Sequence, residues 1–419
     1  MKIVSKLTNS FREYPRAFKI LIFVTFIDRL GGFLLFPFFS LYITNRFGVG
    51  VTEVGILIAI FSAGGIIGSM VGGALADKYG RRALALFGLI TSGIGSIVMG
   101  LVDNLSLFFI VAAVLGVLGD FGGPARQAMV ADLLTKEKQA EGFGLLRVAV
   151  NVSATIGPIF GGFLWKQSYM LLFIADAASS LATAVIMFIF IPETKPKPQE
   201  GKHEESLIQT LLGYKEVLKD VVYVLFLTVS MLTVIVYMQL NSTLSIFLIN
   251  FIGMPPEVFG FLISMNAIMV VVLQFWITKR ISKYAPMKMM ALGTLFYMIG
   301  FGMYGFVSET YLYFIAMAIV TIGEMIDIPV SQAAAANFAP EDKRARYMAA
   351  FGFHWGIPNL FGVYVSGLVM DNIGPVWIWY FCIILSLVAI TGFWVLNKPT
   401  KARFAEIKEQ LKVSIEELE

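Results

Sequence analysis

Apolar runs long enough to cross a lipid bilayer recur along almost the whole chain. Of the 419 residues, 58% are hydrophobic and 14% are charged, whereas soluble domains carry about 25% charged residues. A spanning helix needs roughly 20 apolar residues, which leaves room for about a dozen spans. We therefore expect an all-α membrane protein with twelve spans, at about 17–46, 51–77, 83–102, 105–133, 138–165, 168–191, 220–250, 255–278, 289–308, 310–338, 343–370 and 375–397.

A polar stretch rich in proline and charge divides these spans into two sets of six. It begins at Pro192 and is typical of a linker. The expected organisation is an N-terminal bundle at 1–192, a cytoplasmic linker at 193–219, a C-terminal bundle at 220–397 and a cytoplasmic tail at 398–419. Helical spacing of apolar residues predicts amphipathic helices in the linker, at about 208–215, and in the tail.

Basic residues are distributed unequally between the two sets of loops. With the amino terminus in the cytoplasm, 27 of the 32 Lys and Arg residues fall in segments on that side. Only Arg46 and Lys166 fall in loops on the other side. Since cytoplasmic loops are enriched in Lys and Arg, both termini are predicted to be cytoplasmic.

The two halves also repeat each other at a constant offset of 205 residues. The offset pairs Pro124 with Pro329 and Gln127 with Gln332, and further pairs are Lys78 with Lys283, Tyr79 with Tyr284, Gly157 with Gly362, and Gly162 with Gly367. Proline, glycine, glutamine and lysine at equivalent points indicate two parallel copies of a six-span unit.

The loop between spans 2 and 3 carries unusually dense charge. It reads Gly73-Ala-Leu-Ala-Asp77-Lys-Tyr-Gly80-Arg81-Arg82, which is too polar for a lipid-facing helix. This stretch resembles the loop signature G-x-L-A-D-[RK]-x-G-R-[RK] of the major facilitator superfamily of secondary transporters. The resemblance implies twelve transmembrane helices in two pseudo-symmetric six-helix bundles. It also implies a conformational latch, formed here by Gly73, Asp77, Gly80, Arg81, Arg82 and Asp132. The alternative is that these charges only anchor the loops.

Span 5 carries a row of small residues around a proline. The row resembles the antiporter signature of the same family, with one serine in place of a glycine, and comprises Gly144, Ser153, Gly157, Pro158, Gly161 and Gly162. The resemblance implies export in exchange for protons. Ordinary close packing of helices through small residues is the alternative interpretation.

Ionisable residues inside spans are costly and are functional candidates by default. The family resemblance places spans 1, 4, 7 and 10 around a central cavity. The proton-coupling candidates are Asp28, Asp120, Glu324, Asp327 and, in span 11, His354. The substrate-contact candidates are Arg29, Arg126, Tyr237, Gln239 and Asn241. For each charged residue, an internal ion pair that fixes helix packing is the alternative.

The chain resembles the drug:proton antiporter (multidrug efflux) branch of this family, and the resemblance implies a proton-coupled antiporter that exports small amphipathic, drug-like and cationic molecules. It would be a monomer in the plasma membrane of a prokaryote, with protons, a small-molecule substrate and lipid as partners and no nucleic acid. One alternative is a transporter of an anionic or zwitterionic metabolite, with Arg29 or Arg126 as a carboxylate clamp. A membrane enzyme or receptor is a third possibility, without a phosphate-binding loop to favour it. Two histidines and one cysteine argue against a zinc-type site, and no cofactor is expected.

Overall fold

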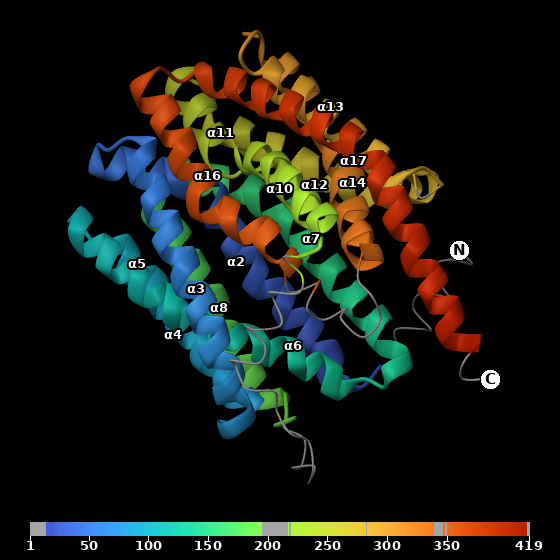
Figure 1. Ribbon diagram of the computed structural model, residues 1–419. Coiled ribbons are helices and arrows are strands. Elements are labelled where there is room, and N and C mark those ends of the chain that lie inside the picture. The colour runs from blue at the N-terminus through green and yellow to red at the C-terminus, as the bar shows by residue number, and fades with distance from the viewer. Residues whose placement is uncertain are drawn as a thin grey trace, which may run out of the picture. The chain divides into compact units, whose positions relative to one another are not determined.

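The structure is a computed structural model that describes residues 14–194, 217, 219–281, 283–338, 347 and 350–416. The amphipathic segment expected at 208–215 lies outside these residues. Within the described part of the chain every regular element is a helix (Figure 1). Ten helices are long and apolar enough to cross a membrane. Two shorter ones, α13 (Pro286–Met303) and α16 (Phe353–Asn372), take the ninth and eleventh places, and the expected all-α fold of twelve helices is confirmed.

The chain divides into two compact units, and unit 1 holds most of the first six spans. It contains α2 (Arg16–Phe47), α3 (Val51–Tyr79) from Leu57 onward, α4 (Arg81–Leu101), α5 (Leu105–Gly119), α6 (Gly122–Leu133), α7 (Lys136–Gln167), α8 (Tyr169–Phe190) and α12 (Pro256–Ile281) as far as Ala267. Within it, α2 packs against α7 and α8, and α4 packs against α8. Phe18, Leu89, Met129 and Met187 contribute to its buried core.

The fourth span is interrupted between α5 and α6. Asp120 ends α5 with φ −88° and ψ 1°, outside the usual helical region. Pro124 follows closely, and because proline has no N–H it cannot continue the hydrogen-bond ladder across the break. The second half-helix approaches α4 closely, since a Cβ added to Gly88 would lie 2.9 Å from the nitrogen of Gly122. The span expected at 105–133 is therefore formed by α5 and α6 together, with a carboxylate at their junction.

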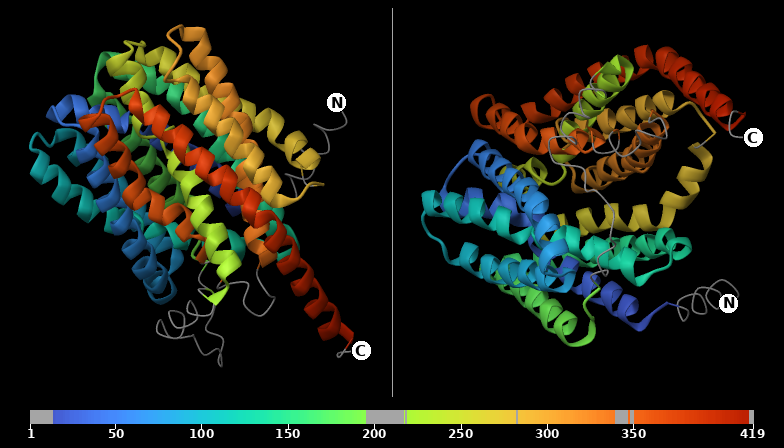
Figure 2. Two further views of the ribbon diagram at one scale, coloured as in Figure 1. Left: turned by 45° about the horizontal axis from the view of Figure 1, so that its top comes forward. Right: turned by 60° about the horizontal axis from the view of Figure 1, so that its bottom comes forward.

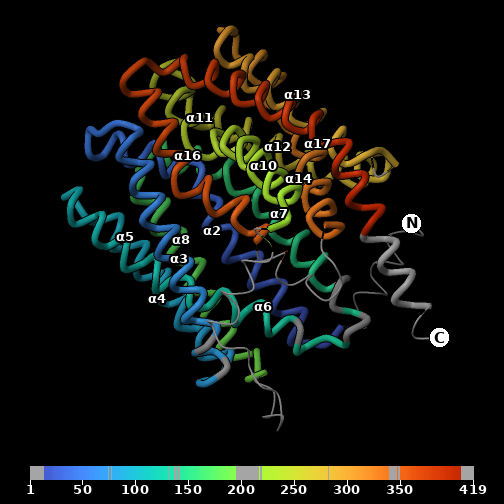
Figure 3. Tube along the Cα trace, viewed as in Figure 1, coloured from blue at the N-terminus to red at the C-terminus, as the bar shows by residue number. Residues whose placement is uncertain are grey.

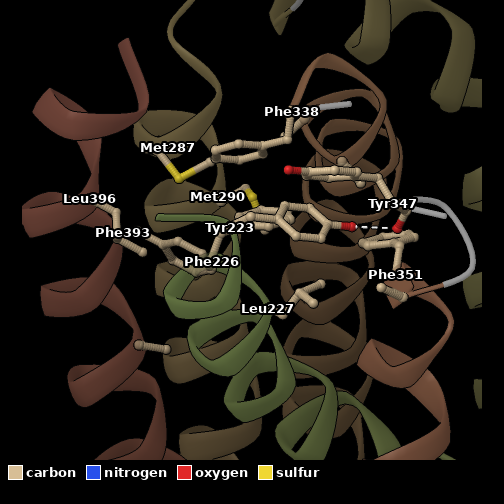
Figure 4. Packing of buried hydrophobic residues seen from close by; sticks show 14 of the residues in the cluster. Tyr223, Phe226, Leu227, Met287, Met290, Phe338, Tyr347, Phe351, Phe393 and Leu396 are labelled. Atoms are coloured by element: carbon tan, nitrogen blue, oxygen red, sulfur yellow. Dashed lines mark hydrogen bonds between the residues drawn. The ribbon is translucent and has the colours of Figure 1, made fainter. Parts of the chain in front are cut away.

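Unit 2 holds most of the later spans (Figure 2). Besides α13 and α16, it contains the segment Gly50–Ile56, α10 (Val221–Met238), α11 (Thr243–Ser245), the wider helical turns of η1 (Ile246–Phe251), α12 from Ile268 onward, α14 (Thr310–Phe338) and α17 (Trp377–Glu416). Its core joins α10, α13, α14 and α17 through aromatic and methionine side chains, among them Tyr223, Met290, Phe338 and Phe393 (Figure 4). Tyr223 donates a hydrogen bond of 2.7 Å to the carbonyl of Tyr347.

The last helix, α17, continues without interruption from the twelfth span into the tail (Figure 3). Beyond the span, Phe404 packs its ring against Phe338 with centroids 4.9 Å apart. Arg403 contacts the carboxylate of Asp220 at 3.1 Å, and Tyr347 donates a hydrogen bond of 3.0 Å to the same group. The beginning of the tail is thus fixed to the end of the bundle.

Large apolar side chains also cover the outside of the helices. Phe275 is 80% exposed, Trp394 67% and Phe188 63%. Exposed apolar surface on this scale is unfavourable in water and matches a lipid environment. The composition and the surface of the fold therefore agree on a membrane protein.

Candidate functional site

A cluster of charged side chains lies inside unit 1, centred on Asp28 of α2. Arg126 of α6 donates a hydrogen bond from Nη1 to Oδ2 of Asp28 at 2.7 Å. Ser180 of α8 donates to the other oxygen at 3.2 Å. The side chains of Asp28 and Arg126 are 13% and 27% exposed, so the pair is largely shielded from water. The ion pair thus joins two helices and does not form between the sequence neighbours Asp28 and Arg29.

Further charged residues of unit 1 lie near this pair. Asp120 lies at the break of the fourth span, with Ser69 beside it. Arg29 interacts electrostatically with Asp120, Asp28 and Arg126. Asp176 of α8 adds a third carboxylate near Asp28. Three acids face two bases, so the cluster as a whole is acidic.

A second group, inside unit 2, is built around the two acids of α14. Tyr237 of α10 donates a hydrogen bond of 3.1 Å to Oε1 of Glu324. Asp327 is 3% exposed, and its Oδ1 has no hydrogen-bond partner among the described residues. A Cβ added to Gly293 of α13 would lie 3.2 Å from the Cβ of Asp327. Glu324 therefore contacts α10, and Asp327 packs against α13.

Aromatic side chains fill the space around these acids. Tyr297 of α13 interacts electrostatically with Asp327, Glu324 and Tyr237, and its hydroxyl has no hydrogen-bond partner in the described part of the chain. Sequence reasoning missed Tyr297, although it lies one turn of helix beyond Gly293. His354 is buried between Phe351, stacked at 4.7 Å, and Trp355. Neither nitrogen of His354 has a partner within the residues described.

Two of the polar candidates of span 7 lie where that span changes direction. Gln239 is fully buried, and its amide nitrogen donates to the carbonyl of Ile235 at 2.8 Å and to Ser366 at 2.7 Å. Thr243 donates to its amide oxygen at 2.8 Å. These hydrogen bonds engage both the nitrogen and the oxygen of the side-chain amide, and they link α10 to α11 and α16. They support a structural role for Gln239. Asn241 lies two residues further on, half-buried in the same turn.

Glu193, which is not part of the sequence motif, fixes the charged loop after α3 by capping the next helix. Both oxygens of Glu193 face the beginning of α4, accepting from the backbone N–H of Arg81 at 2.9 Å and of Arg82 at 3.2 Å. A carboxylate at a helix amino terminus is favourable. Gly80 has φ +106°, and a Cβ there would lie 2.5 Å from Glu193, so only glycine fits. The sequence signal that could have predicted this cap is an acid directly after Pro192, at the end of span 6.

The remaining members of the loop motif are placed as follows. Arg81 forms an ion pair with Asp132. Arg82 contacts the carbonyl of Phe188 and lies over its ring, 4.9 Å from the centroid. A Cβ on Gly73 would make ordinary contact, at 3.8 Å, with Pro124. The side chain of Asp77 lies outside the described part of the structure.

The small residues of span 5 pack α7 against α2. Added Cβ atoms would lie 2.6 Å from the Cβ of Phe33 at Gly157 and 2.4 Å from the carbonyl oxygen of Leu34 at Gly161. Ser153 donates to the carbonyl of Phe26 at 2.9 Å. Pro158 lies inside the helix. Gly144 has open space around it and Gly162 faces α12, so the row serves two different contacts.

Twelve helices, a basic loop after the second span and buried carboxylates define a secondary transporter as the class of protein. The chain belongs to the Major Facilitator Superfamily, whose family model matches residues 21–326 and 240–418. It is therefore a multi-pass membrane transporter of small molecules and not an enzyme.

Two named relatives are about a quarter identical to this chain over the aligned residues. A Na⁺, Li⁺, K⁺/H⁺ antiporter of Planococcus maritimus is 23% identical over 94% of this chain and 99% of its own length. Multidrug resistance protein 1 of Bacillus subtilis is 27% identical over 50% of this chain and 53% of its own length. Among solved structures, the nucleoside transporter NupG superposes with a TM-score of 0.81 at 14% identity, covering 91% of this chain and 100% of its own. At that identity the likeness shows the fold alone.

Proposed function

We propose that the protein is a proton-driven antiporter that exports small amphipathic cations. The observation that carries this proposal is the carboxyl pair of α14, with Asp327 buried and Glu324 bonded to Tyr237. An ionisable group inside a membrane span is costly unless it has a function or a partner. A carboxyl group that a proton and a cation occupy in turn couples their movements in opposite directions.

The acidic balance of the cluster in unit 1 supports a cationic substrate. Asp28, Asp120 and Asp176 outnumber Arg29 and Arg126, and Arg126 is engaged by Asp28. The alternative of an Arg clamp for an anion would need Arg126 to leave that ion pair. Tyr237 and Trp355, whose rings meet edge to face at 5.7 Å, offer aromatic surface for cation–π contact. A relative named Multidrug resistance protein 1, which matches half of the chain, supports a drug-like substrate.

A monovalent metal cation is a second candidate substrate for the same mechanism. The relative named as a Na⁺, Li⁺, K⁺/H⁺ antiporter aligns over nearly the whole of both chains. Carboxylate, hydroxyl and carbonyl oxygens are the ligands that such hard cations require. Asp120, with Ser69 beside it at the end of the half-helix α5, supplies ligands of this kind.

Transport in proteoliposomes under an imposed pH gradient tests the proposal. Asp327→Asn and Glu324→Gln should each abolish accumulation against a gradient while retaining substrate exchange at equal pH on both sides. Glu309→Gln, at an exposed loop position, is the matched control and should behave as the wild type. Organic cations, Na⁺ and K⁺, and carboxylate metabolites are tried in parallel. Accumulation by the double variant Glu324→Gln/Asp327→Asn would remove α14 from the coupling.

The Arg81–Asp132 ion pair, together with Asp77, is proposed as the cytoplasmic latch of the transport cycle. The pair joins α4 to the end of α6, and Glu193 fixes the backbone of Arg81. Asp77→Asn and Asp132→Asn should each shift the protein toward states open to the cytoplasm. Distances between spin labels on the cytoplasmic loops measure this shift, and unchanged distances in both variants would reject the latch.

A further inference from the structure

The helix that carries the two acids of unit 2 continues through a proline. α14 runs without interruption from Thr310 to Phe338, with Pro329 inside it. Because proline has no N–H, the carbonyl of Met325, four residues earlier, loses the partner that it would have in a regular helix. Met325 is fully buried, and an unpaired carbonyl group in apolar surroundings is costly. At this point α14 therefore needs a donor from another helix.

The donor comes from α12. The side-chain nitrogen of Gln274 donates a hydrogen bond of 2.9 Å to the carbonyl of Met325. The same nitrogen donates to the hydroxyl of Thr278, one turn further along α12, at 2.8 Å. A side-chain amide nitrogen carries two hydrogens, so both are used and the orientation of the amide group is fixed. Gln274 thus takes the place of the N–H that Pro329 lacks.

The equivalent place in unit 1 has a shorter side chain and a broken helix. The offset of 205 residues gives the three residues of this contact counterparts in unit 1, which pair as Gln274 with Ser69, Met325 with Asp120 and Pro329 with Pro124. There the N–H of Gly123 donates to the carbonyl of Asp120 at 3.2 Å, in the tight turn between α5 and α6. The span with serine is interrupted, whereas the span with glutamine is continuous.

The carbonyl held by Gln274 lies on the turn that carries both acids of α14. Met325 directly follows Glu324 and precedes Asp327 by two residues. Tyr237 of α10 donates to Glu324, and Gly293 of α13 leaves room for the Cβ of Asp327. One helical turn is therefore held from α10, α12 and α13. Release of the carbonyl would let this turn rotate and would move both carboxyl groups together.

We propose that Gln274 is a positioning residue for proton coupling, which holds the turn of α14 so that Glu324 and Asp327 keep their places. The inference rests on the proposed function, because it takes the acids of α14 as the coupling groups. Gln274 acts through the backbone of Met325 and carries no charge that would neutralise the acids. Positioning matters, since a displacement of about 1 Å can slow a reaction step about a hundredfold.

A first experiment tests whether Gln274 acts through the carbonyl of Met325. Gln274→Leu removes the donor and keeps a side chain of similar size. Hydrogen–deuterium exchange of the α14 segment 322–333 should become about tenfold faster, because a buried acceptor is left without a partner. Pro329→Ala restores the backbone N–H, and in that background Gln274→Leu should change the exchange rate by less than about twofold. Equal effects in both backgrounds would overturn the proposal.

A second experiment tests whether this contact matters for coupling. In proteoliposomes, Gln274→Leu should lose accumulation under an imposed pH gradient and keep substrate exchange at equal pH, whereas a general structural defect would lower both. Gln274→Leu/Pro329→Ala should regain accumulation. Wild-type accumulation by Gln274→Leu would overturn this inference alone. If the wild-type protein itself accumulates no substrate, the proposed function fails, and the two failures are thus distinguishable.

Two threonines provide a milder variant and its matched control. Thr278→Val removes the group that orients the amide of Gln274 and should reproduce both effects of Gln274→Leu in weaker form. Thr391→Val removes an exposed hydroxyl that donates within its own helix, to the carbonyl of Leu387 at 2.9 Å, and should leave both measurements unchanged. If Gln274→Leu fails to fold, Thr278→Val carries the test, and wild-type behaviour of that variant would overturn the proposal.

Discussion

Arg126 of α6 pairs with Asp28 of α2 at 2.7 Å, although Arg29 is the neighbour of Asp28 in sequence. Adjacent residues of a helix point about 100° apart, because 3.6 residues make one turn. Asp28 can therefore reach Arg126 of α6 and Ser180 of α8. The pair fixes three helices of unit 1 with one carboxylate.

Neutralising one partner of this pair should destabilise unit 1. Asp28→Asn leaves Arg126 without its counter-charge in a largely shielded place, at a cost of about 1–3 kcal/mol. The measurement is the melting temperature of the purified protein in detergent, which should fall. The double variant Asp28→Asn/Arg126→Gln should recover part of the loss, since the unpaired charge is then gone.

The control for this prediction is the ion pair of Arg46 with Asp103. Its carboxylate side chain is 75% exposed, so Asp103→Asn should change the free energy of unfolding by less than about 1 kcal/mol. If Asp28→Asn and Asp103→Asn lose equal free energy of unfolding, shielding from water does not strengthen the Asp28–Arg126 pair.

A comparison of two glycines tests the geometry of the charged loop. Gly80→Ala should lower stability by about 1–3 kcal/mol, because its φ of +106° is strained for any side chain and Glu193 occupies the space. Gly144→Ala, inside α7 with nothing within 4 Å, should be neutral or stabilise the helix by up to about 1 kcal/mol. Thermal unfolding of both variants decides the point, and a neutral Gly80→Ala would show that the turn is not required.

Thiol labelling tests the orientation of the chain. With Cys382 replaced, single cysteines are placed at positions 104, 201 and 414. An impermeant thiol reagent added to intact cells should label position 104 alone, because 27 of 32 basic residues fall in segments predicted to lie on the other side. Labelling after permeabilisation is the control for accessibility. Modification at 201 in intact cells would reverse the predicted topology.

The contact between the tail and the bundle gives a further stability prediction. Arg403→Ala removes a side chain that bonds Asp220 at 3.1 Å and should lower the melting temperature, with a loss of about 1–2 kcal/mol. Lys401→Ala, at an exposed position two residues earlier, is the control and should have no effect. If both variants have the melting temperature of the wild type, the contact of the tail does not stabilise unit 2.

The sequence by itself determined the membrane class, the twelve spans and the internal repeat. Hydropathy is a property of continuous segments, because every backbone group in a bilayer must be satisfied within its own helix. The loop Gly73–Arg82 indicated the family, and the family model agrees. The offset of 205 residues, visible in Pro124 with Pro329, also anticipated which glycines would be equivalent.

Only the tertiary structure decided the partners of the individual side chains. The pairing of Asp28 with Arg126, the cap that Glu193 places on α4 and the contact of Asp371 with α3 join residues that are 98, 112 and 320 positions apart. Such contacts depend on how each helix is rotated and where it is interrupted, as at Asp120. These features are set by packing between helices, which hydropathy within one segment does not encode.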